Sequence, residues 1–280
     1  MESASGTASP ALFVPPRILV RPATAADDDA AEALARRLGT PPIGPEGGDP
    51  PDGRDDERWT LTVEGMRRTL TRPDGARLDV DFTGGRTAAR QHERGLARQP
   101  LARAVGLTRL RKRLGRAVRL VDATGGLGRD AWFVASLGCR VTLIERSPLV
   151  HALLEAALAR AALDPAGADS AARITLALGD ARTLLAGLDR SRADVVYLDP
   201  MYPASRRRAA VNKGMQFLHA LVGGEADEAG LLAAALDAAG SQVTVKRPAA
   251  APPIGGDEAF TGQRSTITSP GTRYDVYLVG

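Results

Sequence analysis

The stretch AVRLVDATGGLGRDAWFVASLG, residues 117–138, decides the fold. Its opening segment, AVRLVDA, is an almost continuous apolar run, as expected for a strand buried on both faces of a parallel sheet. A glycine-rich turn follows, and DAWFVASLG then has the pattern of a helix that ends at a glycine. This order predicts the first unit of an open α/β sheet. Ligands bind beyond the carboxyl ends of strands in such sheets, so we expect a site around residues 122–130.

The same alternation continues to the end of the chain. Helical segments separate four further predicted strands: RVTLIER (140–146), RITLALGD (173–180), ADVVYLDP (193–200) and QVTVKRP (242–248). The last segment, STITSPGTRYDVYLVG (265–280), predicts a hairpin around Pro270-Gly271. We therefore expect an α/β protein with a doubly wound, Rossmann-like sheet and an antiparallel hairpin at its C-terminal edge.

Ahead of this sheet the pattern changes. A short strand is expected at ILVRP (18–22), followed by a helix that ends at Gly39, and residues 58–85 alternate with period two, as in an antiparallel meander. The predicted organisation is a small α+β N-terminal subdomain at 1–85 with a loose tail at 1–16 and a flexible loop at 40–57, connecting helices at 86–116, and the ligand-binding domain at 117–280.

Composition excludes several classes of protein. The chain has 280 residues, 44% of them hydrophobic, but no stretch approaches the roughly 18 unbroken apolar residues of a membrane helix. We see no secretory signal, and Cys139 is the single cysteine, so we expect a cytoplasmic protein without internal disulfides. For the oligomeric state we favour a monomer. The three histidines lack metal-ligand spacing, and we expect no metal. Arginines cluster at 109–119, densely enough to attract phosphate.

Two kinds of ligand fit the glycine turn. Gly126, Gly128 and Ala131 match the dinucleotide fingerprint G-x-G-x-x-G/A. Together with Gly125, the same turn would let S-adenosylmethionine approach the backbone. Asp122 would lie close to a dinucleotide pyrophosphate and repel it, whereas it suits the cationic amino end of S-adenosylmethionine or a water bound there. We therefore favour S-adenosylmethionine over NAD.

Three further acids lie where strands end or helices begin. Asp130, at a helix start, also disfavours a pyrophosphate, although carboxylates are common there for structural reasons. Glu145 ends the second strand of the sheet just before Ser-Pro, where an acid usually binds ribose hydroxyls. Asp180 ends the third strand and can accept a hydrogen bond from an adenine amino group, or simply cap the next helix.

The fourth strand ends in VVYLDPMYP, residues 195–203. The exocyclic amine of a nucleobase is a poor nucleophile because its lone pair is delocalised into the ring. The Asp199 carboxylate and the Pro200 carbonyl could accept its two N–H bonds, and the Tyr202 ring could stack on the base. An isolated Asp-Pro turn is usually structural, but this one should face the glycine turn across the cleft. We therefore predict that Asp199, Pro200 and Tyr202 are catalytic, and that Met201 shapes the pocket wall.

Several stretches, in matching order and spacing, resemble the RsmJ family. They are LDVDFTGG (78–85), VDATGGLGRDAWFVASLGCRVTLIERSPLVHALL (121–154), VVYLDPMYP (195–203), LVGGEAD (221–227) and VKRPAAAPP (245–253). Members of this family are bacterial 16S rRNA guanine-N2 methyltransferases that use S-adenosylmethionine. The resemblance runs from about Leu78 to the C-terminus. It implies methylation of a guanine amine, guanine-1516, with 16S rRNA or the small ribosomal subunit as partner.

The resemblance also implies a set of cofactor contacts: Arg129, Asp130, Glu145, Arg146, Asp180, Ala181 and Asp199. Some relatives have Ser-Ser where this chain has Asp180-Ala181, and relatives have phenylalanine where it has Tyr202. Basic residues after the D-P-M-Y turn and at the end of the next strand could hold RNA phosphate, and the last two are expected to open onto the same side of the sheet as the site: Arg206, Arg207, Lys213, Lys246 and Arg247.

Three other functions fit parts of this pattern. A D-P-x-Y turn also serves amino-methyltransferases that act on DNA or on a protein glutamine. A non-catalytic RNA-binding ribosome assembly factor could keep the fold, although the intact glycine turn and D-P-M-Y turn argue against it. A nicotinamide dehydrogenase would share the glycine turn, and we expect no NADH binding.

Overall fold

The computed structural model describes residues 17–40, 58–84, 95–201, 213–222, 227–256 and 260–279. The predicted tail at 1–16 and, apart from Thr40, the predicted loop at 40–57 lie outside these ranges. So do Tyr202, Arg206 and Arg207, which were predicted to act on the substrate. No helix within the described ranges has the length and apolar character needed to cross a bilayer.

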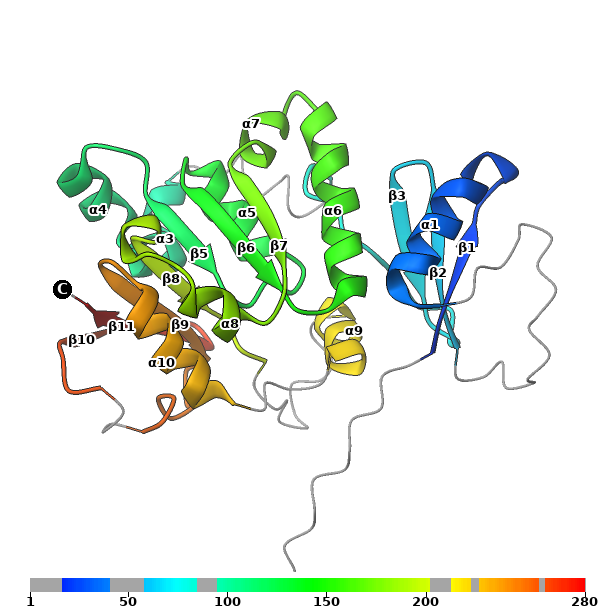
Figure 1. Ribbon diagram of the computed structural model, residues 1–280. Coiled ribbons are helices and arrows are strands. Elements are labelled where there is room, and N and C mark those ends of the chain that lie inside the picture. The colour runs from blue at the N-terminus through cyan, green and yellow to red at the C-terminus, as the bar shows by residue number, and fades with distance from the viewer. Residues whose placement is uncertain are drawn as a thin grey trace, which may run out of the picture.

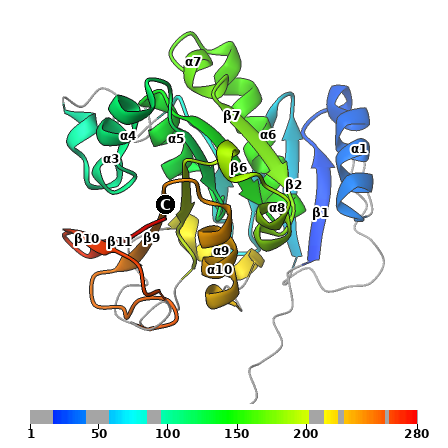
Figure 2. The ribbon, with the colours of Figure 1, turned by 60° about the vertical axis from the view of Figure 1, so that its left-hand side comes forward.

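The N-terminal residues form a four-stranded sheet with one helix. The elements are β1 (Arg17–Pro22), the 3-10 turn η1 (Ala25–Asp27), α1 (Asp28–Leu38), β2 (Arg58–Glu64), β3 (Arg67–Thr71) and β4 (Arg77–Asp79). Strands β2, β3 and β4 form the antiparallel meander that the period-two pattern predicts, and β1 pairs with β2 in parallel. Helix α1 ends where Gly39 adopts φ +66°, a conformation that favours glycine. Figure 2 shows α1 at the outer margin of the molecule.

Short helical segments lead from this sheet to the second one. They are η3 (Leu96–Arg98), α3 (Pro100–Ala104) and α4 (Leu107–Leu114). Pro100 is the first residue of α3, and its fixed φ suits that position. The division of the chain near residues 85 and 116 stays a prediction.

The second sheet has seven strands in the order β10-β11-β9-β8-β5-β6-β7 (Figure 1). Their bounds are β5 (Arg119–Asp122), β6 (Arg140–Glu145), β7 (Ile174–Leu178), β8 (Val195–Leu198), β9 (Gln242–Pro248), β10 (Arg264–Ser269) and β11 (Thr272–Leu278). The pairs among β7, β6, β5, β8 and β9 are parallel, and the β10–β11 hairpin adds to β9 in antiparallel fashion. The predicted fold class, a doubly wound Rossmann-like sheet with a C-terminal hairpin, is confirmed.

Two layers of helices cover this sheet. The helices are α5 (Arg129–Ser136), α6 (Pro148–Leu163), α7 (Ala168–Ala171), α8 (Ala181–Ala186), the 3-10 turn η4 (Arg190–Arg192), α9 (Lys213–Val222) and α10 (Glu228–Ala238). Successive strand residues point to opposite faces. Leu120 and Tyr197 therefore pack in the apolar cluster of α3 to α6, whereas Val121 and Val196 pack with α8 and α10.

Strand β5 is the point where the order of the sheet reverses. The chain runs outward from β5 through β6 and β7, then returns to the other side of β5 with β8 and β9. The connections diverge at this point, so the carboxyl ends of β5 and β8 are where a ligand is expected.

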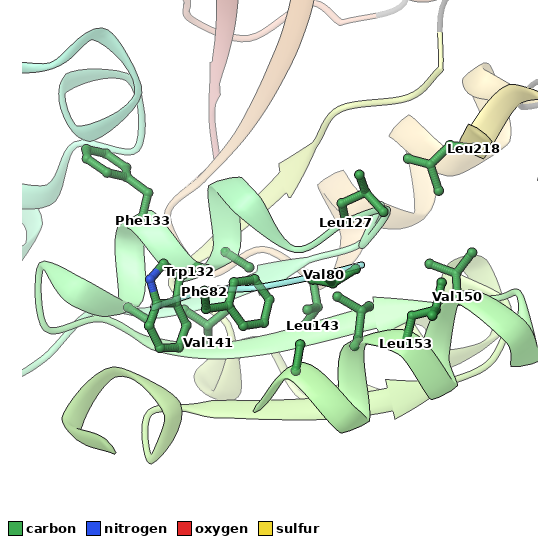
Figure 3. Packing of buried hydrophobic residues seen from close by; sticks show 14 of the residues in the cluster. Val80, Phe82, Leu127, Trp132, Phe133, Val141, Leu143, Val150, Leu153 and Leu218 are labelled. Atoms are coloured by element: carbon green, nitrogen blue, oxygen red, sulfur yellow. The ribbon is translucent and has the colours of Figure 1, made fainter. Parts of the chain in front are cut away.

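The N-terminal sheet and the second sheet share one apolar cluster. Phe82, which follows β4, stacks on Trp132 of α5 with ring centroids 4.7 Å apart and planes 10° apart (Figure 3). Both rings are buried, and so is Cys139, whose pKa burial raises to about 11. Phe82 therefore fixes the segment after β4 against α5, the helix that follows the glycine turn.

A second contact joins the N-terminal sheet to α9. Trp59 of β2 meets Phe217 of α9 edge to face, with centroids 5.3 Å apart. The Arg72 guanidinium lies 5.6 Å from the centroid of each ring, within cation–π range. The sheet of β1 to β4 therefore packs against both α5 and α9, which border the site described next.

Candidate functional site

The carboxyl ends of β5, β6 and β8 border a cavity of about 330 Å³. Its walls come from residues 122–130 after β5, 144–146 at the end of β6, 179–182 after β7 and 199–201 after β8. Leu218 of α9, Leu231 of α10 and Lys246 of β9 also line it. The acids that the sequence analysis singled out at four strand ends therefore share one cavity.

Close packing requires the glycines of the turn between β5 and α5. Gly125 donates its N–H to the Ile144 carbonyl at 2.8 Å, and a Cβ on Gly125 would lie only 2.7 Å from that oxygen. Gly128 has φ +69°, and a Cβ there would lie 2.9 Å from Leu154 Cδ2. A larger residue at either position would push the turn away from β6 or α6. The turn thus packs tightly on its outer side while it lines the cavity on its inner side.

Glu145 ends β6 with only 6% of its surface exposed. Its Oε2 accepts the N–H of Gly126 at 2.9 Å, and its Oε1 accepts the N–H of Ser147 at 2.7 Å. Burial raises the pKa of Glu145, and these backbone N–H groups oppose that rise. The carboxyl is thus held at both oxygens with acceptor capacity remaining, as a hydroxyl-binding acid requires. Arg146 lines the same wall.

Asp122 and Asp199 end the two central strands and are joined through Thr124. The Asp199 N–H donates to Thr124 Oγ1 at 2.6 Å, and the Thr124 N–H donates to Asp122 Oδ1 at 3.1 Å. Burial raises the pKa of Asp122 to about 8; the Thr124 N–H opposes this rise, and the nearby carboxyls of Asp130 and Asp199 add to it. The end of β8 is therefore fixed against the turn after β5.

A chain of charged and polar groups runs along the cavity wall. The Tyr197 hydroxyl donates to Asp130 Oδ2 at 2.7 Å, and Lys246 Nζ donates to the same oxygen at 2.8 Å. Lys246 Nζ also lies 2.8 Å from Asp199 Oδ2. Burial disfavours the charge of Lys246, but the two carboxylates outweigh it and raise the pKa of the ammonium. Lys246 is therefore a cation bound to both carboxylates.

Asp180 and Ala181 lie on the wall beyond β7. Asp180 caps α8: its Oδ1 accepts the N–H of Arg182 at 2.9 Å, and its Oδ2 pairs with the Arg182 guanidinium at 2.8 Å. This pairing holds the pKa of Asp180 at about 2. Asp180 therefore has the capping role that was the structural alternative, while it also lines the cavity.

Most of the remaining predicted positions that the structure describes line the cavity. Arg129, Pro200 and Met201 line the cavity, so Met201 forms part of the wall as expected. Lys213 is the first residue of α9. Among the residues that the structure describes, no group of three or more His, Cys, Asp or Glu side chains is arranged to hold a metal ion.

The structure corrects the expectation for Arg247. Lys246 and Arg247 are neighbours on β9, so they point to opposite faces of the sheet instead of opening onto the same side. The Arg247 guanidinium donates to Glu228 Oε2 of α10 at 2.8 Å and to the Pro252 carbonyl at 3.1 Å, and its side chain is 3% exposed. It lies in the interior, where RNA phosphate does not reach. Lys246 lies within the cavity, where two carboxylates already bind its ammonium.

The arginine-rich segment at 109–119 lies at the opposite end of the strands. Arg116 binds Asp194 in a bidentate pair, at 2.7 and 2.9 Å. Arg119 donates to the Ser191 carbonyl at 2.7 Å. Asp194 precedes β8, so these contacts gather at the amino ends of the strands, away from the cavity. Each arginine of the segment thus has a partner within the protein, while Arg109, Arg111 and Arg113 remain exposed, so their attraction for phosphate stays a prediction.

Sequence reasoning missed Lys246, Tyr197 and Thr124 as members of the cavity network. The signal for Lys246 was present in QVTVKRP: a period of two along the strand separates Lys246 from Arg247 and places Lys246 on the face of Thr244. No comparable signal exists for Thr124 or Tyr197, since their partners come from other strands and from α5.

Comparison with known proteins gives a consistent set of similarities. Residues 54–279 match the family described as "Putative SAM-dependent methyltransferase". The chain is 42% identical over 268 residues to ribosomal RNA small subunit methyltransferase J of Thioalkalivibrio sulfidiphilus. This match covers 94% of this chain and 98% of that protein. It is 40% identical over 263 residues to the protein of the same name from Pseudomonas paraeruginosa, covering 94% and 95%.

A solved structure extends this likeness to three dimensions. A SAM-dependent methyltransferase from Neisseria gonorrhoeae is 33% identical to this chain and superposes with a TM-score of 0.66. The match covers 94% of this chain and 95% of that one. The likeness therefore includes the N-terminal sheet as well as the seven-stranded sheet.

Proposed function

We infer the reaction from one premise: the chain belongs to the RsmJ family of S-adenosylmethionine-dependent methyltransferases, the ribosomal RNA small subunit methyltransferases J. S-adenosylmethionine is the cofactor, and the reaction is methylation of small-subunit ribosomal RNA. We propose that the acceptor is the N2 amine of a guanine, guanine-1516 by family resemblance, in 16S rRNA or the small subunit. We also propose that the protein works in the cytoplasm as a monomer.

Two features of the cavity support a fit to S-adenosylmethionine. The buried Glu145 offers fixed acceptor oxygens, which suit ribose hydroxyls. Asp130 and Asp199 lie at the end of the β5 turn and outnumber the Lys246 ammonium that binds them both, which suits the cationic end of the cofactor and would repel a pyrophosphate. The Asp122 carboxyl, whose pKa burial raises to about 8, adds hydrogen-bonding capacity beside them. We propose that further contacts come from Gly125, Gly126, Gly128, Arg129, Arg146, Asp180 and Ala181.

The residues at the end of β8 would orient the acceptor. When bound, the cofactor supplies a methyl group on a positively charged sulfur, so the electrophile is already activated. What remains for the protein is to position the amine. We propose that the Asp199 carboxylate and the Pro200 carbonyl accept its two N–H bonds and so localise the nitrogen lone pair. Tyr202 would stack on the guanine, which must be unpaired or turned out of its helix.

We propose that RNA phosphate is held by residues that follow the D-P-M-Y turn in the sequence. Arg206 and Arg207 are three and four residues beyond Pro203. Lys213 begins α9, the helix whose Leu218 lines the cavity, so a phosphate contact there would lie on the element that borders the site.

The position of Asp199 carries this proposal. Its main chain is bonded to Thr124 of the β5 turn and its side chain to Lys246, so its carboxyl is fixed in the cavity beside the proposed cofactor site. Asp199→Asn keeps the shape and removes the charge. We expect the rate of methyl transfer to 16S rRNA to fall about 10²–10³-fold, the usual cost of one preorganised electrostatic contact.

The experiment uses the full chain, cofactor with a labelled methyl group, and three acceptors: small subunits lacking the modification, DNA and a glutamine-containing protein. Cofactor binding measured by calorimetry separates loss of transfer from loss of binding. Label at N2 of one guanine, lost in Asp199→Asn, is the expected result. Near-normal turnover by Asp199→Asn would refute its role, and label on DNA or protein would refute the substrate.

A further inference from the structure

We propose that Lys246 is a positioning residue: its ammonium binds one oxygen of the Asp199 carboxylate, so that the other oxygen is presented to the amine of the acceptor base. This inference rests on the proposed function, in which Asp199 receives that amine. It replaces the expectation that Lys246 contacts RNA phosphate.

The strand register brings the two side chains together. Leu198 of β8 pairs with Val245 of β9 in parallel, so Asp199 and Lys246 are the next residues along neighbouring strands. Because side chains alternate along a strand, Asp199 points to the same face of the sheet as Tyr197, and Lys246, its neighbour on β9, points to that face too. The resulting distance from Nζ to Asp199 Oδ2 is 2.8 Å.

The other end of the network anchors Lys246. Its Nζ lies 2.8 Å from Asp130 Oδ2, and the same oxygen accepts the hydroxyl of Tyr197 at 2.7 Å. Tyr197 is 2% exposed, whereas the side chain of Lys246 is 28% exposed and that of Asp199 is 37% exposed. The network thus runs from the packed interior to the cavity, and its buried end restricts the lysine.

The contacts of Asp199 leave one oxygen free for the base. Its N–H is bonded to Thr124 Oγ1 and its Oδ2 to Lys246, and no described residue donates to its Oδ1. A compact ammonium suits this task because its donors can point to two separate carboxylates, whereas a guanidinium binds as a planar fork.

The surroundings make the charge of Lys246 necessary. Among the described residues, the ionisable groups that face Asp199 or Lys246 are Asp122 of β5, Asp130 of α5, Tyr197 of β8 and Tyr274 of β11. Each is negative when ionised. Burial already raises the pKa of Asp199, and Lys246 is the cation that opposes the rise. Without it, Asp199 would hold a proton over a wider range of pH and could accept one N–H fewer.

The test compares Lys246→Met, Lys246→Gln and Lys246→Arg with Lys112→Met. Lys112 is an exposed lysine on α4 at the opposite end of the strands, so its loss controls for a change in net charge. We expect Lys246→Met to lower kcat about 10–100-fold, the effect of losing a charged hydrogen bond. The acid limb of its kcat profile should move to higher pH by about 1–3 units, because loss of a neighbouring cation raises a carboxyl pKa. Lys246→Arg should restore the position of that limb.

A second measurement does not depend on turnover. Carboxyl ¹³C shifts of labelled aspartate, followed through a pH titration of the cofactor-free protein, should show the pKa of Asp199 higher in Lys246→Met and Lys246→Gln. The Lys246→Gln side chain can still donate a hydrogen bond, so this variant serves for the test if Lys246→Met does not fold. If kcat, acid limb and Asp199 titration stay at wild-type values while Asp199→Asn is inactive, this inference is wrong. If Asp199→Asn itself keeps its activity, the proposed function fails instead.

Discussion

The two ends of the central strands carry opposite kinds of charge cluster. At the amino ends, all five arginines of the segment 109–119 donate to protein acceptors, among them Asp194 and Gln242. At the carboxyl ends, Asp122, Asp130 and Asp199 gather around Lys246 and line a cavity. The first cluster is dense in the sequence, and each of its arginines has a partner within the protein. The second is scattered through the sequence and retains acceptor capacity.

This difference teaches that charge density along the chain is a poor guide to a binding site. Asp194 and Asp122 show the physical reason. The Asp194 pKa, which burial alone would raise, is lowered because Arg116 and the Arg119 N–H bind the carboxylate. The Asp122 pKa is raised because its burial is not matched by a cation. A buried carboxyl whose pKa is raised because no cation pairs with it is typical of a functional site, and here it lies at the carboxyl ends of the strands.

The largest effect that would sharpen the comparison is expected from Glu145→Ala at the carboxyl end. The change leaves the N–H groups of Gly126 and Ser147 without their acceptor and removes the proposed ribose contact. Losses of this kind are about 1–3 kcal/mol, so we expect the dissociation constant of the cofactor to rise about 10–100-fold. Titration calorimetry measures it, with Glu145→Gln as the control that keeps one acceptor oxygen. A dissociation constant that stays at the wild-type value in Glu145→Ala would count against the assignment.

At the amino end we expect stability to change while catalysis does not. Arg116→Met removes the partner of Asp194, which is 5% exposed, but the Arg119 N–H still binds that carboxylate and Arg116 itself is partly exposed. We therefore expect a loss of about 1–2 kcal/mol in the free energy of unfolding. Urea unfolding measures the loss, and kcat should stay at the wild-type value. A fall in kcat comparable to that of Asp199→Asn would break the comparison between the two ends.

The last effect at the carboxyl end is expected in the pH dependence of stability. Asp122 has a folded pKa of about 8, above the usual 3.8, so between these values the folded protein keeps a proton that the unfolded chain releases. The contribution of Asp122 to stability is therefore greatest at low pH and falls as pH rises towards 8. Asp122→Asn should remove this fall, and the difference between the two urea midpoints should widen with pH. Midpoint curves that run parallel would contradict it.

Much of the fold could be predicted from the sequence because local signals agree with the tertiary structure. Ser147 and Pro148 mark the start of α6, Gly39 the end of α1, and Pro270-Gly271 the turn of the last hairpin. The strand ends also identified Glu145 and Asp199 as cavity residues. These features depend on short-range geometry, which period and turn chemistry encode.

The rest could not be predicted because it depends on pairs that are distant in the sequence. The bond between Tyr197 and Asp130 requires knowing that β8 lies next to β5, and the parallel pairing of β1 with β2 spans a long loop. Arg247 shows a different limit: its burial follows from alternation along β9, but its partner Glu228 belongs to α10. The partners of the arginines at 109, 113, 116 and 119 could not be predicted either, because their acceptors at 191–194 and 241–242 are remote in the sequence.

The packing of Phe82 and Trp59 has a consequence for the order in which the molecule is made. Both residues leave the ribosome long before Phe217, the partner of Trp59 on α9, has been synthesised. Bringing such distant parts of a chain together has an entropic cost that delays the contact. We therefore expect the first sheet to form early, to contact α5 through Phe82, and to complete its docking only when α9 emerges. The cavity, which α9 borders, is then among the last parts of the protein to mature, so an incomplete chain would not yet hold its cofactor.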